Sequence, residues 1–280
     1  MLSRLTGALL RAVLIGGAFA LPLLIVPADS PGKALVVSIL VVSAFFWTFV
    51  EYASASPSII EFRDTPPFNR IRFLTMAAII FALSHIQAHG ETSTPLTTLA
   101  FNVGVIVGHS VDFTGSPIWM MTQQFPGTLE PGEYATYLAS AGMAYLLALA
   151  SVIVFMAVFF LQDWPAKSGP FNMWKNLPSF NPSSDTDIVS SLNFDARVNI
   201  LLGFVLPFLI PWIIGAVFRF IGISLFGDPY LMIWVVSGWA ILPAGMIMRG
   251  VALSKVSQMI AAQRKVLEAQ ATAQGLSTAP

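Results

Sequence analysis

The three histidines of the chain, His85, His89 and His109, lie close together in the sequence and are followed by Asp112. His85 and His89 are spaced i, i+4, so on a helix both rings project from the same face. With His109 or Asp112 folded back toward them, three nitrogen and oxygen ligands could hold zinc, iron or copper. Two histidines from different helices could instead ligate haem. The spacing is weakly specific, and the first expectation is that these histidines make ordinary structural hydrogen bonds.

Two short patterns resemble parts of membrane-enzyme motifs. The pattern His85-x-x-x-His89 resembles one histidine box of the membrane fatty-acid hydroxylases and desaturases, which need several such boxes. The run from Phe81 to His85 is similar to the second motif of the CAAX-type intramembrane proteases, but their Glu-Glu-x-x-x-Arg motif is missing here. The chain has no cysteine, which excludes disulfides and cysteine nucleophiles. The sequence therefore carries no complete catalytic motif.

The composition predicts that these residues are carried by membrane-spanning helices. Of the 280 residues, 56% are hydrophobic and only 10% are charged, and the mean hydropathy is +0.76. A soluble domain averages about a quarter charged residues. The fourteen basic and fourteen acidic residues balance, so no global field would recruit nucleic acid.

Six apolar stretches approach the length of about 20 residues that a helix needs to cross a bilayer. Pro207 and Pro211 lie within the fifth stretch and Pro243 within the sixth, and each is expected to kink its helix. The first stretch could be a signal peptide, but the apolar run that follows at once favours a retained span. The six stretches cover residues 9–25, 34–53, 71–88, 137–161, 200–218 and 229–248.

The charges of the loops indicate whether the more polar segment 96–111 is a seventh span. If it does not cross and the N-terminus is inside, every basic residue except Lys33 and Arg219 lies inside. If it crosses, the basic residues divide almost evenly between the two sides. The positive-inside bias therefore predicts six spans with both termini inside. Residues 89–136 then form an external segment that is re-entrant or interfacial and packs on the bundle.

Two elements are predicted to lie in the cytoplasm. The loop 163–197 carries the aromatic residues Trp164, Phe171, Trp174 and Phe180, and its segment Pro170 to Phe180 is expected to rest on the inner membrane interface. The polar part of this loop, Asn181 to Asp195, is a natural contact for a soluble partner. Residues 251–280 read as a helix with a disordered tail, and the helix extends into the cytoplasm, lies on the interface or docks on another subunit.

Small residues predict where helices approach each other closely. Gly104 and Gly108 form a Gly-x-x-x-Gly pattern, and Ser140, Gly142 and Ala144 follow in the fourth span. Internal packing is the first expectation for these residues, and contact between subunits is the second.

No acidic or basic residue falls near the centre of any predicted span, which disfavours ion-coupled transport. We therefore expect an all-α, six-span protein of the bacterial inner membrane that is a non-catalytic structural or assembly subunit, for example of a secretion or conjugation apparatus. Its expected partners are membrane lipid, other membrane subunits and a cytoplasmic protein. Two alternatives stay open: a metal- or haem-binding enzyme or electron-transfer subunit centred on His85, His89 and His109, and a passive channel or carrier.

Overall fold

The computed structural model describes residues 2–27, 30–55, 58–63, 65–124, 130–161, 164, 173–178 and 187–274. This part of the chain is all-helical, and six of its helices are long and apolar enough to cross a membrane. The chain is therefore a multi-pass membrane protein, as its apolar stretches predicted. The six long helices are α1 (Leu2–Ile25), α2 (Pro31–Ala53), α3 (Phe68–Ala88), α6 (Pro131–Leu161), α8 (Ile188–Ile221) and α9 (Pro229–Ala273).

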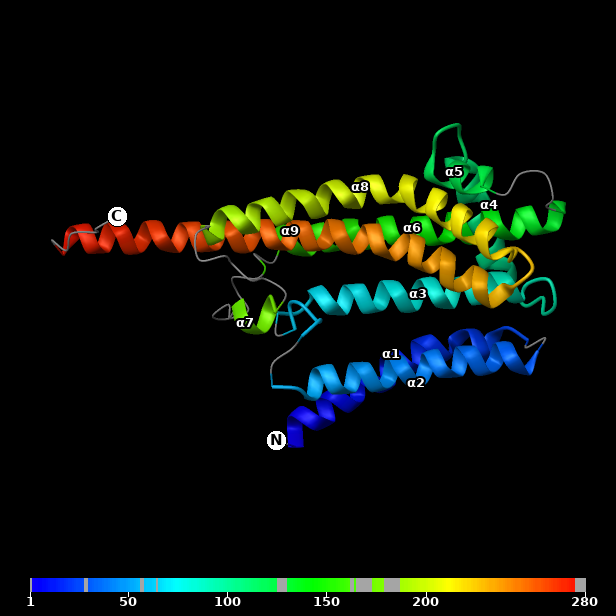
Figure 1. Ribbon diagram of the computed structural model, residues 1–280, viewed down its shortest axis with the longest axis horizontal. Helices are drawn as coiled ribbons and strands as arrows, with labels where there is room; N and C mark the ends of the chain where they lie inside the picture. Colours follow the sequence, from blue (N-terminus) through cyan, green and yellow to red (C-terminus); the bar gives the residue numbers. More distant parts are fainter. Residues whose placement is uncertain are drawn as a thin grey trace.

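Both ends of the chain lie at the same end of the helix bundle, which we call the termini side (Figure 1). The short helix α7 (Met173–Asn176) lies on this side. The opposite end, here called the distal side, carries α4 (Pro95–Val111) and α5 (Pro117–Gln123). Six crossings bring both termini to one side, so α4 is not a seventh span. The loop charges predicted this, and α4 packs on α3 and α6 as expected of the segment.

Side-chain caps explain where five of the helices begin. A hydroxyl or carboxylate before the first turn accepts a hydrogen bond from a backbone N–H that has no partner within the helix. Proline follows most of these caps directly, and its fixed φ suits the first helical position. The capping residues are Ser30, Thr94, Ser116, Asp187 and Asp228.

Helix α8 begins earlier than the sequence predicted. Residues 188–195, assigned above to the polar cytoplasmic loop, are the first turns of this helix. Asp187 caps it, and Leu192 and Ala196 are buried. Ser257 of α9 donates a hydrogen bond to the carbonyl of Val189 at 3.2 Å, which shows that α9 covers these turns. The part of the loop prediction at 181–186 lies outside the described residues.

Helix α9 is the longest element of the molecule, with 45 residues. The predicted C-terminal helix is therefore a direct continuation of the last span, with no break near residue 250. The helix continues beyond the bundle (Figure 1). Helices α8 and α9 bend together along their length in Figure 1, and both contain internal proline.

Glycines bring helix backbones into contact inside the bundle. A Cβ atom on Gly104 would collide with the carbonyl of Ala139, and one on Gly108 with the carbonyl of Leu138. On the facing helix, a Cβ on Gly142 would collide with the backbone of α4. The Gly-x-x-x-Gly pattern therefore packs α4 on α6 within one chain, which was the first of the two expectations.

The start of α9 is fastened to the turn between α1 and α2 on the distal side. The Lys33 ammonium lies 3.4 Å from the Asp228 carboxylate. The hydroxyl of Tyr230, which is buried, donates to the carbonyl of Val26 at 3.0 Å. The α1–α2 hairpin is thus tied to the last span at this end of the molecule.

Candidate functional site

The first two histidines make separate contacts at the distal end of α3. The Nδ1 atom of His85 lies 2.9 Å from the carbonyl of Phe81, and the two rings are 4.3 Å apart. His89 follows the last residue of α3, and its ring stacks on Phe101 of α4 at 4.7 Å. Its Nδ1 atom lies 3.5 Å from the hydroxyl of Thr97. Both side chains therefore have the ordinary structural contacts that were the first expectation.

The remaining predicted ligands lie further along α4. His109 is exposed, and the Asp112 carboxylate accepts a hydrogen bond from the Tyr134 hydroxyl at 2.9 Å. Within the described residues, no three His, Asp or Glu side chains are placed to hold a metal ion together. The structure thus does not assemble His85, His89, His109 and Asp112 into one centre. The metal and haem hypotheses gain no support from this geometry.

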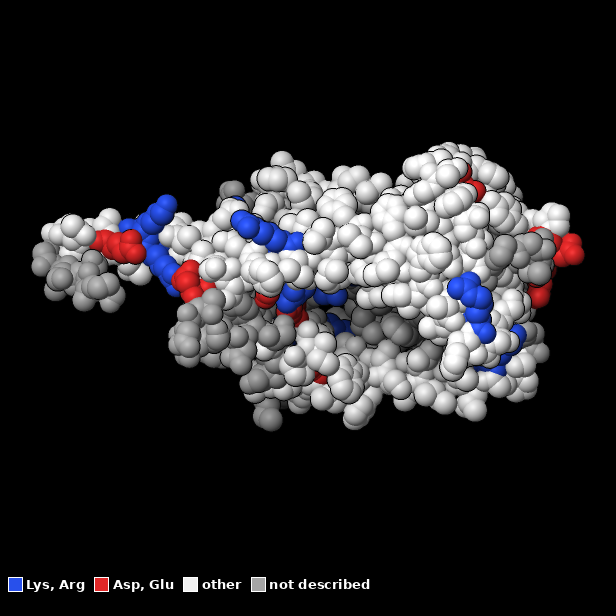
Figure 2. All heavy atoms as spheres, turned by 45° about the horizontal axis from the view of Figure 1, so that its top comes forward, with Lys and Arg blue, Asp and Glu red and all other residues white. Residues whose placement is uncertain are grey.

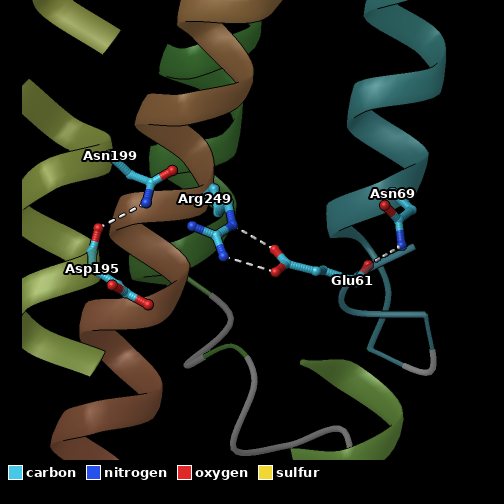
Figure 3. A network of polar contacts seen from close by, with 5 residues as sticks. All are labelled: Glu61, Asn69, Asp195, Asn199 and Arg249. Carbon is cyan, nitrogen blue, oxygen red and sulfur yellow. Dashed lines mark hydrogen bonds and ion pairs between the residues drawn. The ribbon is translucent and has the colours of Figure 1, made fainter. Parts of the chain in front are cut away.

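A pair of opposite charges joins α9 to the α2–α3 loop on the termini side (Figure 3). Arg249 donates from Nε and Nη2 to the two carboxylate oxygens of Glu61, at 2.6 and 2.8 Å. The Glu61 side chain is only 9% exposed and that of Arg249 28%. Asn69, in the first turn of α3, donates to the Glu61 carbonyl at 2.8 Å and holds the loop in place. A two-pronged contact of this kind fixes direction as well as distance.

A second buried carboxylate shapes the same loop. Glu51, near the end of α2, accepts hydrogen bonds from the backbone N–H groups of Ser58, Ile59 and Ile60. It also accepts from the Ser58 hydroxyl at 2.8 Å. Arg63 donates to the carbonyl of Glu51 at 3.2 Å. The Glu51 carboxylate therefore accepts the hydrogen bonds of loop N–H groups that lie outside any helix. Its role is structural.

The described part of the α6–α8 connection packs into this region. Trp164 is 2% exposed, its indole N–H donates to the Thr65 carbonyl, and its ring contacts those of Phe62, Phe68 and Phe155. This aromatic cluster buries Trp164 inside the protein.

The termini side also carries an ion pair between α8 and α9. Arg264 donates to the Asp187 carboxylate that caps α8. The hydrogen bond from Arg264, with further help from the backbone N–H of Ser190, lowers the pKa of Asp187. This ion pair is exposed, and beyond it α9 extends past the start of α8.

No known protein family, curated protein or solved structure matches this chain. Its function is therefore argued from the arrangement of its own residues. Sequence reasoning missed the charged contacts of the termini side, because Glu61 and Arg249 are 188 positions apart. No local pattern of residues signals such a pair.

Proposed function

We propose that this protein is an assembly subunit of a membrane protein complex, and that the end of α9 binds another subunit. The observation that carries the proposal is the free C-terminal part of α9. After Arg264, the helix runs on to Ala273. Val266 and Leu267 lie on this extension and are 56% and 64% exposed. Large apolar side chains on a helix outside the membrane are typical of a helix-docking surface.

The bundle holds this extension in a fixed direction. Leu253 and Val256 of α9 are buried, and Ser257 is hydrogen-bonded to α8. The Asp187–Arg264 ion pair adds a contact at the last point of overlap. A partner would therefore meet a helix that is already ordered, which lowers the entropy cost of binding.

The charged residues of the termini side support a structural role. The carboxylates of Glu51 and Glu61 are each occupied by several donors from the same chain. Neither is positioned as a general acid or base at an open site. The apolar surface supports residence in a lipid bilayer, since most of the face in Figure 2 carries no charged side chain.

The proposed location is the bacterial inner membrane, with the termini side in the cytoplasm. Arg63, Arg70 and Arg72 belong to the α2–α3 region on that side, and Arg264 and Lys265 follow on α9. Such a bias of basic residues is typical of cytoplasmic loops. The extension of α9 would then face cytoplasmic or membrane-bound subunits, as in a secretion or conjugation apparatus.

Purification from the native host in a mild detergent tests the proposal. Native mass spectrometry of the full chain should give a complex of fixed stoichiometry. The double variant Val266→Asp/Leu267→Asp should lose the partner while the six-span bundle keeps its melting temperature. The control Gln263→Asp/Gln270→Asp adds the same charge at exposed polar positions of the extension and should keep the partner. A chain that purifies alone, or a partner retained by the first variant, would contradict the proposal.

A further inference from the structure

Arg72 lies in the second turn of α3, on the termini side of the membrane-spanning region. Its guanidinium carbon lies 5.4 Å from the centre of the Phe68 ring, one turn nearer the helix start. The side chain thus reaches back toward the membrane surface, as long basic side chains near helix ends do. A Cβ atom on Gly245 of α9 would lie 4.0 Å from the Arg72 Nε atom. The arginine therefore fits beside a position of α9 that has no side chain.

Among the described residues, no carboxylate forms an ion pair with Arg72. The Glu61 carboxylate lies within electrostatic range of Arg72, but both of its oxygens are bound to Arg249. On α9, Arg249 follows Gly245 by one helical turn. Arg72 of α3, which lies beside Gly245, is therefore a neighbour of Arg249. Arg72 makes no hydrogen bond or ion pair with any other residue that the structure describes, and its side chain is exposed.

A second arginine packs on the ring of Tyr52. The guanidinium carbon of Arg11, on α1, is 4.7 Å from the centre of the Tyr52 ring. Tyr52, on α2, is also within electrostatic range of Arg72. Among the described residues, the only hydrogen-bond partner of Arg11 is the Gly7 carbonyl of its own helix, at 2.9 Å. Figure 2 shows basic side chains gathered beside a hollow midway along the molecule.

We propose that Arg72 and Arg11 bind the phosphate of an anionic phospholipid in the leaflet on the termini side. Guanidinium groups make strong, geometrically defined hydrogen bonds to phosphate oxygens. Both arginines stand on membrane-spanning helices with apolar surfaces. That surface suits acyl chains, so the phosphate belongs to a lipid and not to a soluble ion.

Melting of the purified full chain in detergent micelles tests this inference. Adding phosphatidylglycerol should raise the melting temperature, whereas phosphatidylcholine and inorganic phosphate should have little effect. In Arg72→Gln, the concentration of phosphatidylglycerol for half of the shift should rise about tenfold, the effect of losing one charge-assisted hydrogen bond. Arg11→Gln removes the second guanidinium from another helix and should weaken binding in the same direction.

Arg70→Gln is the matched control, because it removes the same charge from nearly the opposite side of α3, where Arg70 is exposed. This variant should bind phosphatidylglycerol as the unchanged protein does. Equal weakening in Arg70→Gln, or equal stabilisation by phosphatidylcholine, would overturn the lipid site, and so would a shift produced by inorganic phosphate alone. Because the assay needs no partner subunit, its failure would leave the proposed assembly function untouched.

Discussion

The indole N–H of Trp239 in α9 donates a hydrogen bond to the carbonyl of Pro207 in α8, at 3.0 Å. This carbonyl has no partner within its own helix, because the residue four positions on is Pro211, which has no N–H. The tryptophan therefore satisfies a backbone group that would cost several kcal/mol if left bare in lipid. The prolines of α8 are thus part of the packing of α8 on α9.

Replacing Trp239 with Phe should destabilise the protein by about 1 kcal/mol, since the Pro207 carbonyl loses its donor while most of the ring volume is kept. Trp234→Phe is the matched control, because the buried indole N–H of Trp234 has no hydrogen-bond partner among the residues that the structure describes. Unfolding in mixtures of SDS and a mild detergent measures both variants. An equal loss in the two would show that ring volume, and not the hydrogen bond, is the cause.

The Glu61–Arg249 pair should stabilise the fold across two distant parts of the chain. Glu61→Gln or Arg249→Gln should each lower the free energy of unfolding by about 2 kcal/mol, because a partly buried charge loses its partner. In a double-mutant cycle the combined variant should lose much less than the sum. Glu91→Gln, which changes an exposed carboxylate on the distal side, serves as the control. Additive losses would mean that the two residues act independently.

The contact between α4 and α6 should not tolerate even one added methyl group. Gly142→Ala should destabilise the protein by about 2 kcal/mol, since its Cβ would meet the backbone of α4 and force the helices apart. Gly132→Ala, at the start of the same helix, meets nothing within 4 Å and should be neutral or slightly stabilising. The unfolding assay compares the two. A tolerated alanine at position 142 would show that α4 does not pack as described.

The contact of Asp187 with Arg264 should depend on pH in one direction only. Because the folded-state pKa of Asp187 lies below its ordinary value of 3.8, its stabilising effect is complete above that pH. It is lost as the pH falls through the lowered pKa. Hydrogen exchange of the amides around Ser190 should therefore stay slow down to about pH 4 and quicken below it. Asp187→Asn should remove this step, and a step centred above pH 4 would contradict the lowered pKa.

Much of the fold could be predicted because it depends on local composition. A long apolar run predicts a span, and the distribution of basic residues predicts whether the number of spans is even or odd. Residues 188–195 were missed as helix because their many polar side chains suggested a loop. Their burial against α9 depends on a partner far away in the sequence, which no local pattern contains.

The candidate site was harder to predict for the same reason. Histidine spacing indicated a possible ligand set, but the His85 ring contacts the Phe81 carbonyl and the His89 ring stacks on Phe101 instead. The contact between Glu61 and Arg249, and the burial of Trp164, depend on how loops return to the bundle. The absence of charge from the span centres was visible in the sequence, whereas the buried carboxylates at the helix ends were not.

The length of α9 has a mechanical consequence. At about 1.5 Å per residue, its 45 residues span about 68 Å, more than twice the roughly 30 Å of a hydrocarbon core. One end is clamped to the α1–α2 turn through Asp228 and Tyr230, and the other projects beyond Arg264. The helix is thus one continuous rod, which projects from one face of the membrane and is fixed to the rest of the protein at the other. A force or torque applied to the projecting end would be transmitted along α9 to the other face of the bilayer, without any ligand having to cross it.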